Sequence, residues 1–337
     1  MERDSRGSRL NWVDVAKGLG IVLVVVGHVI RGLVSADLMN WTATARFVDA
    51  WIYSFHMPLF FFLSGLFLCR SARRDSLLDF VSDKARVIAY PYIVWSTITV
   101  VLKSALGSIP NKPRELSDLL LLAYEPIEQY WFLYVLFVVT TVIGALVRFV
   151  SPWLIIVIAM AAYPGILPFS TSGTILDRVR ESGIHVALGV IVGLGFLDQL
   201  SRCTVPVLVA LVLVGLGLPA LGIAAGLPNV VPVLAICGTT GIVALALLLD
   251  RMRLVSVVGF IGRYALEILV LHTMASAAVR ISLSSADVRS PALHFFAGNA
   301  AGILIPIAIS SVFRRLGFSM AFTLRKADQQ QPAARPL

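Results

Sequence analysis

Three ionisable residues share one face of the first apolar segment, WVDVAKGLGIVLVVVGHVIRGLV (residues 12–34). Lys17 and His28 are eleven residues apart, which in an α-helix places them about 20° apart around the axis and roughly 16 Å apart along it. Asp14 lies on the same side. Ionisable groups inside a bilayer normally face a protein interior or a water-filled cavity. Because neutral imidazole can take a proton from a hydroxyl, His28 is a candidate general base; the alternative is that Lys17 snorkels and His28 only bonds a neighbouring helix.

The second apolar segment holds a histidine and a proline in FHMPLFFFLSG (residues 55–65). His28 lies about six residues before the end of the first segment, and His56 about seven after the start of the second. Adjacent antiparallel helices would therefore bring both imidazoles to one depth, roughly 10 Å below the membrane surface. Pro58 frees a carbonyl one turn earlier and allows a bend. We interpret His56 as a second catalytic candidate; the alternative is a packed, kinked helix with a satisfied histidine.

A later segment, VVGFIGRYALEILVLHT, adds ionisable residues near the middle of the membrane. Arg263 and Glu267 are four residues apart, so we predict an ion pair within one helix that is structural or lines a cavity. His272 lies about 140° round from Glu267, which disfavours a dyad between them within the helix. The two remaining histidines start other apolar segments and are interpreted as interfacial residues: His185 and His294.

A chain of membrane-spanning helices must position these residues. Of the 337 residues, 58% are hydrophobic and 14% are charged, and the mean hydropathy is +0.87, whereas soluble domains are about half apolar and a quarter charged. Apolar runs of about 20 residues recur along the chain. We predict an all-α polytopic membrane protein with ten transmembrane helices, at residues 13–34, 49–69, 86–106, 129–149, 152–168, 183–198, 203–220, 229–249, 254–276 and 292–313.

The loops predict the sidedness of this bundle. Lysine and arginine are about twice as frequent on the side of both termini as on the other side, so the N- and C-termini are predicted to be cytoplasmic and the protein to lie in the plasma or inner membrane. The formal charge of +9 then reflects topology and anionic lipid rather than nucleic-acid binding. The predicted parts are a cytoplasmic segment (1–12), a ten-helix domain (13–313) and a cytoplasmic, disordered tail (314–337). The outward loop 107–128 is interpreted as solvated, with a lid as the alternative.

Five motifs together resemble the membrane acyltransferase-3 family. They are DVAKGLGIVLVVVGH, FHMPLFFFLSGLF, KARVIAYPYIVWS, EQYWFLYVLF and GFIGRYALEILVLH, in the family's order between residues 12 and 275. The FHMPLFFFLSG form is similar to the branch of fucose 4-O-acetylase and related acetyltransferases. The resemblance implies a ten-helix domain that moves an acyl group, usually acetyl from acetyl-CoA, to a sugar hydroxyl, with His28 as the essential histidine. The closing motif departs from the family at Arg263, where Ser or Thr is usual, and at Glu267-Ile268, where Tyr-Leu is usual.

Such a transfer needs groups for the donor and for the acceptor. Negative charge developing on a thioester carbonyl needs hydrogen-bond donors, for which His56 and Trp131 are candidates. CoA phosphates need cations at the cytoplasmic mouth, where a basic cluster from Arg70 to Arg86 is predicted. The predicted donor-side or cavity residues are Asp14, Lys17, Arg86 and Trp131. The predicted acceptor-side residues are Glu128 and His272.

We therefore expect an integral-membrane O-acyltransferase that uses cytoplasmic acyl-CoA, in the simplest case acetyl-CoA, as a co-substrate. The expected acceptor is a hydroxyl of a surface or exported glycan or glycolipid, and neither a bound cofactor nor a metal site is expected. A transporter of a polar or proton-coupled solute would also line a cavity with Lys, Glu and His, but its flux would not depend on CoA. A non-catalytic membrane partner in glycan assembly would tolerate loss of His28.

Overall fold

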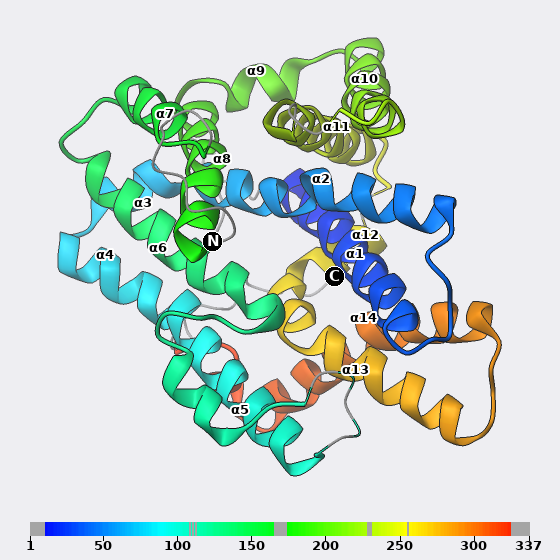
Figure 1. The fold of residues 1–337 in the computed structure, drawn as a ribbon. Helices are drawn as coiled ribbons and strands as arrows, with labels where there is room; N and C mark the ends of the chain where they lie inside the picture. The colour runs from blue at the N-terminus through cyan, green and yellow to red at the C-terminus, as the bar shows by residue number, and fades with distance from the viewer. Residues whose placement is uncertain are drawn as a thin grey trace.

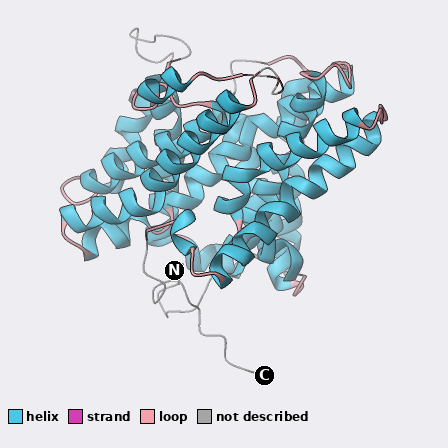
Figure 2. Cartoon of the chain, turned by 90° about the horizontal axis from the view of Figure 1, so that it is seen from below, coloured by secondary structure: helices cyan, strands magenta, loops and turns pink. Residues whose placement is uncertain are grey.

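The computed structural model describes residues 11–107, 109, 111, 113–164, 174–227, 231–254 and 256–324, and this part of the chain is a bundle of helices without a β-strand (Figures 1 and 2). The long helices of the first half are α1 (Asn11–Val34), α2 (Ala43–Gly65), α5 (Tyr90–Ala105) and α6 (Trp131–Leu146). Those of the second half are α8 (Ile175–Gly195), α10 (Val205–Ala224), α11 (Val231–Arg251), α13 (Ala265–Ser285) and α14 (Pro291–Arg315). Shorter helices join them: α3 (Leu68–Arg74), α4 (Leu77–Lys84), α7 (Pro152–Ala161), α9 (Leu197–Arg202) and α12 (Ser256–Arg263).

The first helix, α1, lies at the centre of the bundle. Its apolar window is 67% buried, more than in any other candidate span of the described residues, and α2, α11, α12, α13 and α14 pack around it (Figure 1). Helices α10 and α14 are peripheral, with 22% and 28% of their windows buried. Because lipid tails are as apolar as leucine, close packing must hold these helices together. A residue on the inward face of α1 can therefore be reached from several other helices.

Glycines allow the closest approaches between helices. A β-carbon added at Gly262 of α12 would lie 1.8 Å from the carbonyl oxygen of Asp14 on α1. One added at Gly189 of α8 would lie 2.1 Å from the carbonyl oxygen of Phe62 on α2. Small residues at such contacts let two backbones touch, as is common between membrane helices. These two contacts fix α12 against α1 and α8 against α2.

The number of spans differs from the prediction of ten. Eight helices of the described residues are long and apolar enough to cross a membrane. Helix α7 has only ten residues, too few for a bilayer core of about 30 Å. Helix α8 has 21 residues, but four of its first seven are charged. It nevertheless packs against α2, α6 and α7. Two spans are longer than predicted, at Ala43–Arg74 and Leu77–Ala105.

The second of these long spans contains a π-helical turn at Ala85–Ala89, between α4 and α5. Pro91 lacks a backbone N–H, and in a regular α-helix its ring would clash with the carbonyl of Val87. A wider turn of this kind accommodates such an interruption. Arg86, one of the predicted donor-side residues, is exposed on this turn.

The predicted ninth span is two helices, because α12 and α13 are separated by a break at Tyr264. Glu267 forms its ion pair with Arg314 of α14 and accepts a hydrogen bond from Ser310 at 3.2 Å. The Arg263 guanidinium lies 5.3 Å from the ring centroid of Phe260. The predicted Arg263–Glu267 ion pair within one helix is therefore wrong: the break removes the i, i+4 register on which it depends.

Two connecting segments are more ordered than expected. Residues 107–128 include a 3₁₀ helix at Leu116–Leu121, and the hydroxyls of Tyr92 and Tyr134 donate to the carbonyls of Leu122 and Ala123 at 2.5 and 2.9 Å. After α14, the buried Phe322 stacks on Trp95 with ring centroids 5.4 Å apart. The packed part of the chain thus extends beyond residue 313, while residues 1–10 and 325–337 lie outside the described residues.

Candidate active site

Two cavities meet at one end of the bundle. Their volumes are about 540 Å³ and 430 Å³. The larger lies among α1, α2, α8 and α11, and the smaller among α1, α5, α13 and α14. Four residues line both cavities: His28, Arg31, Glu128 and Gln129. The boundary between the cavities is thus formed by the last turns of α1 and by the short 3₁₀ helix (Glu128–Tyr130) that precedes α6.

All five histidines gather at this end of the bundle, which we call the histidine end. Besides His28, the larger cavity is lined by His56 and His185, and the smaller by His294. His272 is fully buried, and its ring centroid lies 5.0 Å from that of His28. The segment ends predict all five in the outer half of the membrane, and in the structure they lie at one end of the bundle.

His272 is the direct ring neighbour of His28. The rings meet edge to face, at an interplanar angle of 64°. The Nδ1 atom of His272 lies 2.8 Å from the Ile268 carbonyl oxygen and 2.9 Å from that of Leu269. Since carbonyl oxygens only accept, Nδ1 carries the proton, which leaves Nε2 as an acceptor. This Nε2 is buried without a hydrogen-bond partner in the described chain. The sequence assigns His272 to the acceptor side; the structure places it behind His28.

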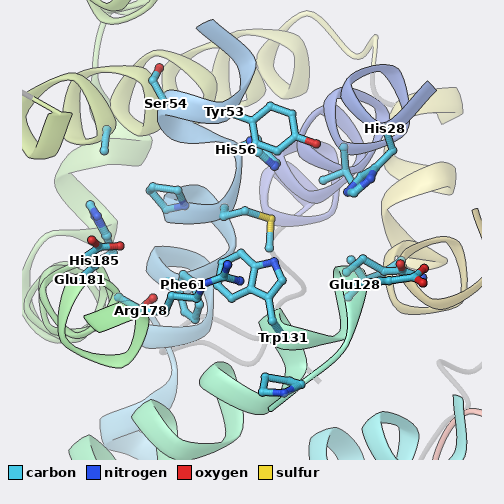
Figure 3. Close-up of a pocket in the computed structure, with 18 of the residues that line it drawn as sticks. His28, Tyr53, Ser54, His56, Phe61, Glu128, Trp131, Arg178, Glu181 and His185 are labelled. Atoms are coloured by element: carbon cyan, nitrogen blue, oxygen red, sulfur yellow. The ribbon is translucent and has the colours of Figure 1, made fainter. Parts of the chain in front are cut away.

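His56 shares the larger cavity with His28 but does not contact it, because Tyr53 lies between them (Figure 3). The Tyr53 ring centroid is 4.6 Å from that of His56 and 6.2 Å from that of His28. The Arg31 guanidinium carbon lies 3.3 Å from the centroid of the Tyr53 ring, and Arg31 Nε forms an ion pair with Asp49 Oδ1 at 2.7 Å. The Tyr53 hydroxyl is buried without a partner among the described residues. Tyr53 thus presents an unused donor between the two histidines.

The His56 ring has a defined polarity. Its Nδ1 atom lies 2.7 Å from the carbonyl oxygen of Ile52 in the same helix, and the side chain is 1% exposed. A neutral ring with its proton on Nδ1 has an acceptor at Nε2. Nearby, Pro58 removes the helical hydrogen bond to the Ser54 carbonyl, and both residues line the same cavity. His56 is therefore suited to accept a hydrogen bond rather than to donate one to an oxyanion.

Glu128 and Gln129 form the wall opposite α1. Glu128 has a positive φ of 45°, a conformation that non-glycine residues rarely adopt and that is frequent at functional sites. Its carboxylate pairs with Lys103 and lies 3.9 Å from Arg114. The side-chain amide nitrogen of Gln129 donates to the Thr273 hydroxyl at 2.9 Å. Its side-chain amide oxygen, Oε1, is buried without a hydrogen-bond partner among the described residues. The wall thus holds a neutralised carboxylate beside an unused acceptor.

The residues predicted for the donor side do not lie together. Trp131 lines the larger cavity, where the Arg178 guanidinium lies 4.5 Å from its ring centroid (Figure 3). Asp14 and Lys17 line neither cavity and lie several turns of α1 away from His28. Arg86 is at the opposite end, where its carbonyl oxygen accepts a hydrogen bond from Leu324 at 3.2 Å. Trp131 therefore belongs with the histidines and not with Lys17.

Sequence reasoning overlooked three residues of this site: Arg31, Tyr53 and Gln129. Two of them carried a signal, because Arg31 follows His28 by three residues and Tyr53 precedes His56 by three, so each shares a helix face with a candidate histidine. Gln129 shares no helix face with a candidate histidine, because it lies in a 3₁₀ turn before α6, and its signal was its place in the EQYWFLYVLF motif. Together with His28 and His272, these residues can remove a proton from a hydroxyl and donate hydrogen bonds to a developing anion.

Comparison with known proteins relates the chain to one protein family. A family profile described as an acyltransferase domain, acyltransferase-3, matches residues 10–311. The match includes every residue that lines the two cavities. No solved structure matches the chain.

Two curated relatives match about half of the chain. The nodulation protein NolL of Mesorhizobium japonicum is 35% identical over 151 residues, which are 44% of this chain and 39% of that protein. The nodulation protein NolL of Sinorhizobium fredii is 29% identical over 162 residues, which are 47% of this chain and 42% of that protein. The chain therefore aligns with less than half of the length of these relatives.

Proposed function

The chain belongs to the acyltransferase-3 family, and on this premise we propose that it is a membrane O-acyltransferase that moves an acyl group from acyl-CoA to a hydroxyl of a glycan or glycolipid. Acetyl-CoA is the proposed donor, and the plasma or inner membrane the proposed location. The relatives named for nodulation do not identify the acceptor.

The observation that carries the proposal is the position of His28 between two cavities. A group transfer needs one base with access to two substrates, and a residue that lines both cavities meets that requirement. His28 is also only partly buried, whereas the other four histidines are each 6% exposed or less. It is thus the histidine with most access to a bound hydroxyl.

The proposed reaction is a direct acyl transfer. The acceptor oxygen attacks the thioester carbonyl carbon while His28 takes the hydroxyl proton. The carbon–sulfur bond then breaks, and His28 returns the proton to the sulfur, so that the products are an ester and free CoA. The imidazolium formed in between lies beside the His272 ring, whose Nε2 has no hydrogen-bond partner among the described residues. We propose His272 as the positioning residue that orients His28, and His56 as the acceptor that holds a substrate hydroxyl.

The negative charge on the thioester oxygen needs donors. Tyr53 has a buried hydroxyl without a described partner, and the Trp131 ring lines the same cavity (Figure 3). Arg31, which lies over Tyr53, adds positive charge nearby. We assign oxyanion stabilisation to Tyr53 and Trp131, in place of the role predicted for His56.

The donor would enter from the opposite end, which we propose to be cytoplasmic. Lys17 and Arg86 remain the proposed contacts of the CoA phosphates. The pantetheine arm is long and thin, so its thioester could reach the histidine end while the nucleotide stays at the mouth. Arg73 and Arg148 at this end are engaged as donors to carbonyls of the chain, at Val147 (2.9 Å) and Asp75 (2.8 Å), and are better regarded as structural.

The test is mass spectrometry of surface glycans and glycolipids from cells with the protein, without it, and with His28→Ala. We expect one additional acyl group on an acceptor only with the unaltered protein, because loss of a general base costs about 10²–10⁴-fold in rate. Size-exclusion chromatography of the detergent-extracted variant checks folding. Full acylation by folded His28→Ala protein, or solute flux independent of CoA, would contradict the proposal.

A further inference from the structure

The smaller cavity is mostly apolar and is bordered by lipid-facing side chains. Its walls include Met274, Ala277 and Ile281 of α13, together with Leu102 and Leu106 of α5. Leu102 and Leu106 are 43% and 40% exposed on the outside of the bundle. In a membrane protein such surfaces face acyl chains. The cavity therefore connects His28 with a route along which a hydrocarbon chain can enter between α5 and α13.

Arg280 adds a cation without an acidic partner to this apolar space. It is half-buried, lines the cavity, and donates to the Gly32 carbonyl oxygen at 3.1 Å. No carboxylate of the described chain lies within ion-pair distance of it, whereas the other cations of the lining are compensated: Arg31 by Asp49 and Lys103 by Glu128. A half-buried guanidinium interacts more strongly with an anion than one in water does.

A second polar group in the same cavity is also unused. His294 is 1% exposed, and its Nε2 lies 2.8 Å from the Val288 carbonyl oxygen. Its Nδ1 is buried without a hydrogen-bond partner among the described residues. Buried polar atoms of this kind are rare and call for a partner. The cavity thus offers one cation and one unsatisfied nitrogen along an otherwise apolar wall.

The position of Arg280 relative to His28 sets the length of the ligand. The carbonyl that Arg280 contacts belongs to Gly32, one helical turn after His28, which is about 6 Å along α1. An anion on Arg280 would therefore lie about one turn further toward the end of the bundle than the candidate base. That interval suits a sugar unit that bridges an anion and a reacting hydroxyl.

We propose that the smaller cavity binds the phosphate of a lipid-anchored acceptor on Arg280, with its hydrocarbon chain between α5 and α13 and its sugar toward His28. Guanidinium is the side chain best suited to a phosphate, because it donates in pairs to its oxygens. The assignment of the ligand as an acceptor rests on the proposed function; the binding of a lipid phosphate does not.

The test measures binding alone, by isothermal titration calorimetry on the purified full chain in detergent. The probes are farnesyl phosphate, farnesol and inorganic phosphate. Arg280→Gln removes the charge and Arg280→Lys keeps it. Arg289→Gln is the matched control, because Arg289 lies at the same end but is highly exposed, and among the described residues it pairs only with Asp287. Ala277→Trp fills the apolar wall.

We expect the wild-type chain to bind farnesyl phosphate at least about tenfold more tightly than either farnesol or inorganic phosphate, since each lacks one half of the ligand. Arg280→Gln should abolish the preference over farnesol, Arg280→Lys should retain part of it, and Ala277→Trp should weaken both prenyl probes. Arg289→Gln should behave as wild type.

Three outcomes would overturn the inference: equal binding of farnesyl phosphate and farnesol by the wild-type chain, equal binding of inorganic phosphate, or an unchanged preference in folded Arg280→Gln. The first two need no variant and so do not depend on its folding. Because no acyl transfer is measured, failure here leaves the proposed function standing. Conversely, an inactive protein that binds farnesyl phosphate through Arg280 would refute the acyltransferase and keep the site.

Discussion

His28 and His272 come from helices far apart in the chain, yet their ring centroids are 5.0 Å apart. His272 is held by two carbonyl oxygens on one nitrogen, so its other nitrogen has a fixed role as acceptor. A base whose orientation is set by a second buried group loses less of its efficiency to ring rotation, as in the triads of hydrolases. The contact between His28 and His272 therefore says more about how the candidate base is oriented than the shared depth of His28 and His56 does.

At the residue scale, we expect His272→Ala to lower kcat about 100-fold and His272→Gln about tenfold, because the glutamine amide can reach the place of Nε2. The KM for the donor should change little, since His272 lines neither of the two cavities. Steady-state kinetics of the purified variants measures both constants.

A purely structural role for His272 would reduce the amount of folded protein and leave kcat per folded molecule unchanged. The pH dependence of kcat/KM separates the two roles, because only a residue acting through His28 should alter it. An unaltered pH profile in folded His272→Gln would contradict the positioning role.

At the scale of elements, α8 shows how a helix with charged first turns is fixed in the bundle. Gly189 lets its backbone touch α2 at the Phe62 carbonyl, whereas a β-carbon at Gly183 would be 4.0 Å from its nearest neighbour, Ala159. We expect Gly189→Ala to destabilise the protein by about 1–3 kcal/mol through overpacking. Gly183→Ala should be neutral or slightly stabilising, because alanine favours helix by up to about 1 kcal/mol.

Thermal unfolding in detergent, followed by circular dichroism, compares these two variants of the same helix. A lower midpoint for Gly183→Ala than for Gly189→Ala would mean that the α2–α8 contact is not the tight one. The comparison matters for the site, because α8 carries His185 and the wall with Arg178.

The link between α13 and α14 supports a second prediction for an element. The Glu267 side chain is 7% exposed and pairs with Arg314, which is 48% exposed. Arg314→Gln leaves a buried carboxylate uncompensated and should destabilise by about 1–3 kcal/mol, less than for a fully buried pair because solvent reaches the arginine. Arg315→Gln, at the adjacent exposed position, should change stability by less than about 0.5 kcal/mol.

Chemical denaturation of both variants, together with Arg263→Gln, measures this link. A larger loss for Arg263→Gln than for Arg314→Gln would restore the pairing that the sequence predicts within one helix.

For the whole molecule, the proposed chemistry requires the histidine end to face outward. Ser117, in the 107–128 segment, and Ser76, before α4, are exposed at opposite ends of the bundle. In a background without Cys69, Cys203 and Cys237, a cysteine at Ser117 should react with a membrane-impermeant thiol reagent in intact cells. A cysteine at Ser76 should react only after permeabilisation, because the excess of lysine and arginine on its side predicts a cytoplasmic position.

Labelling with a permeant reagent controls for accessibility of each thiol. The reverse pattern would place His28 in the cytoplasmic half and leave an outward glycan without access to the base. The cysteine introduced at Ser117 should be labelled to the same extent in intact and in permeabilised cells, which shows that labelling from outside is complete.

The sequence by itself determined the class of the molecule and the half of the membrane in which the candidate catalytic histidines lie. Composition and recurrent apolar runs are sufficient for a helical membrane protein, because a bilayer admits few other solutions. Helical periodicity placed His28 on an inward face, and the segment ends placed all five histidines in one half of the membrane; four of them line the two cavities. The motif order indicated the family that the profile match shows.

Only the tertiary structure decided which side chains meet. His28 lies against His272 with Tyr53 beside it, Glu267 pairs with Arg314 across two helices, and Arg280 ends beside Gly32. Periodicity relates residues within one helix, but the choice of neighbouring helix depends on close backbone contacts such as that of Gly262 with Asp14. Such contacts arise from shape complementarity along whole helices, and a break like that at Tyr264 changes every pairing beyond it, so no local pattern predicts them.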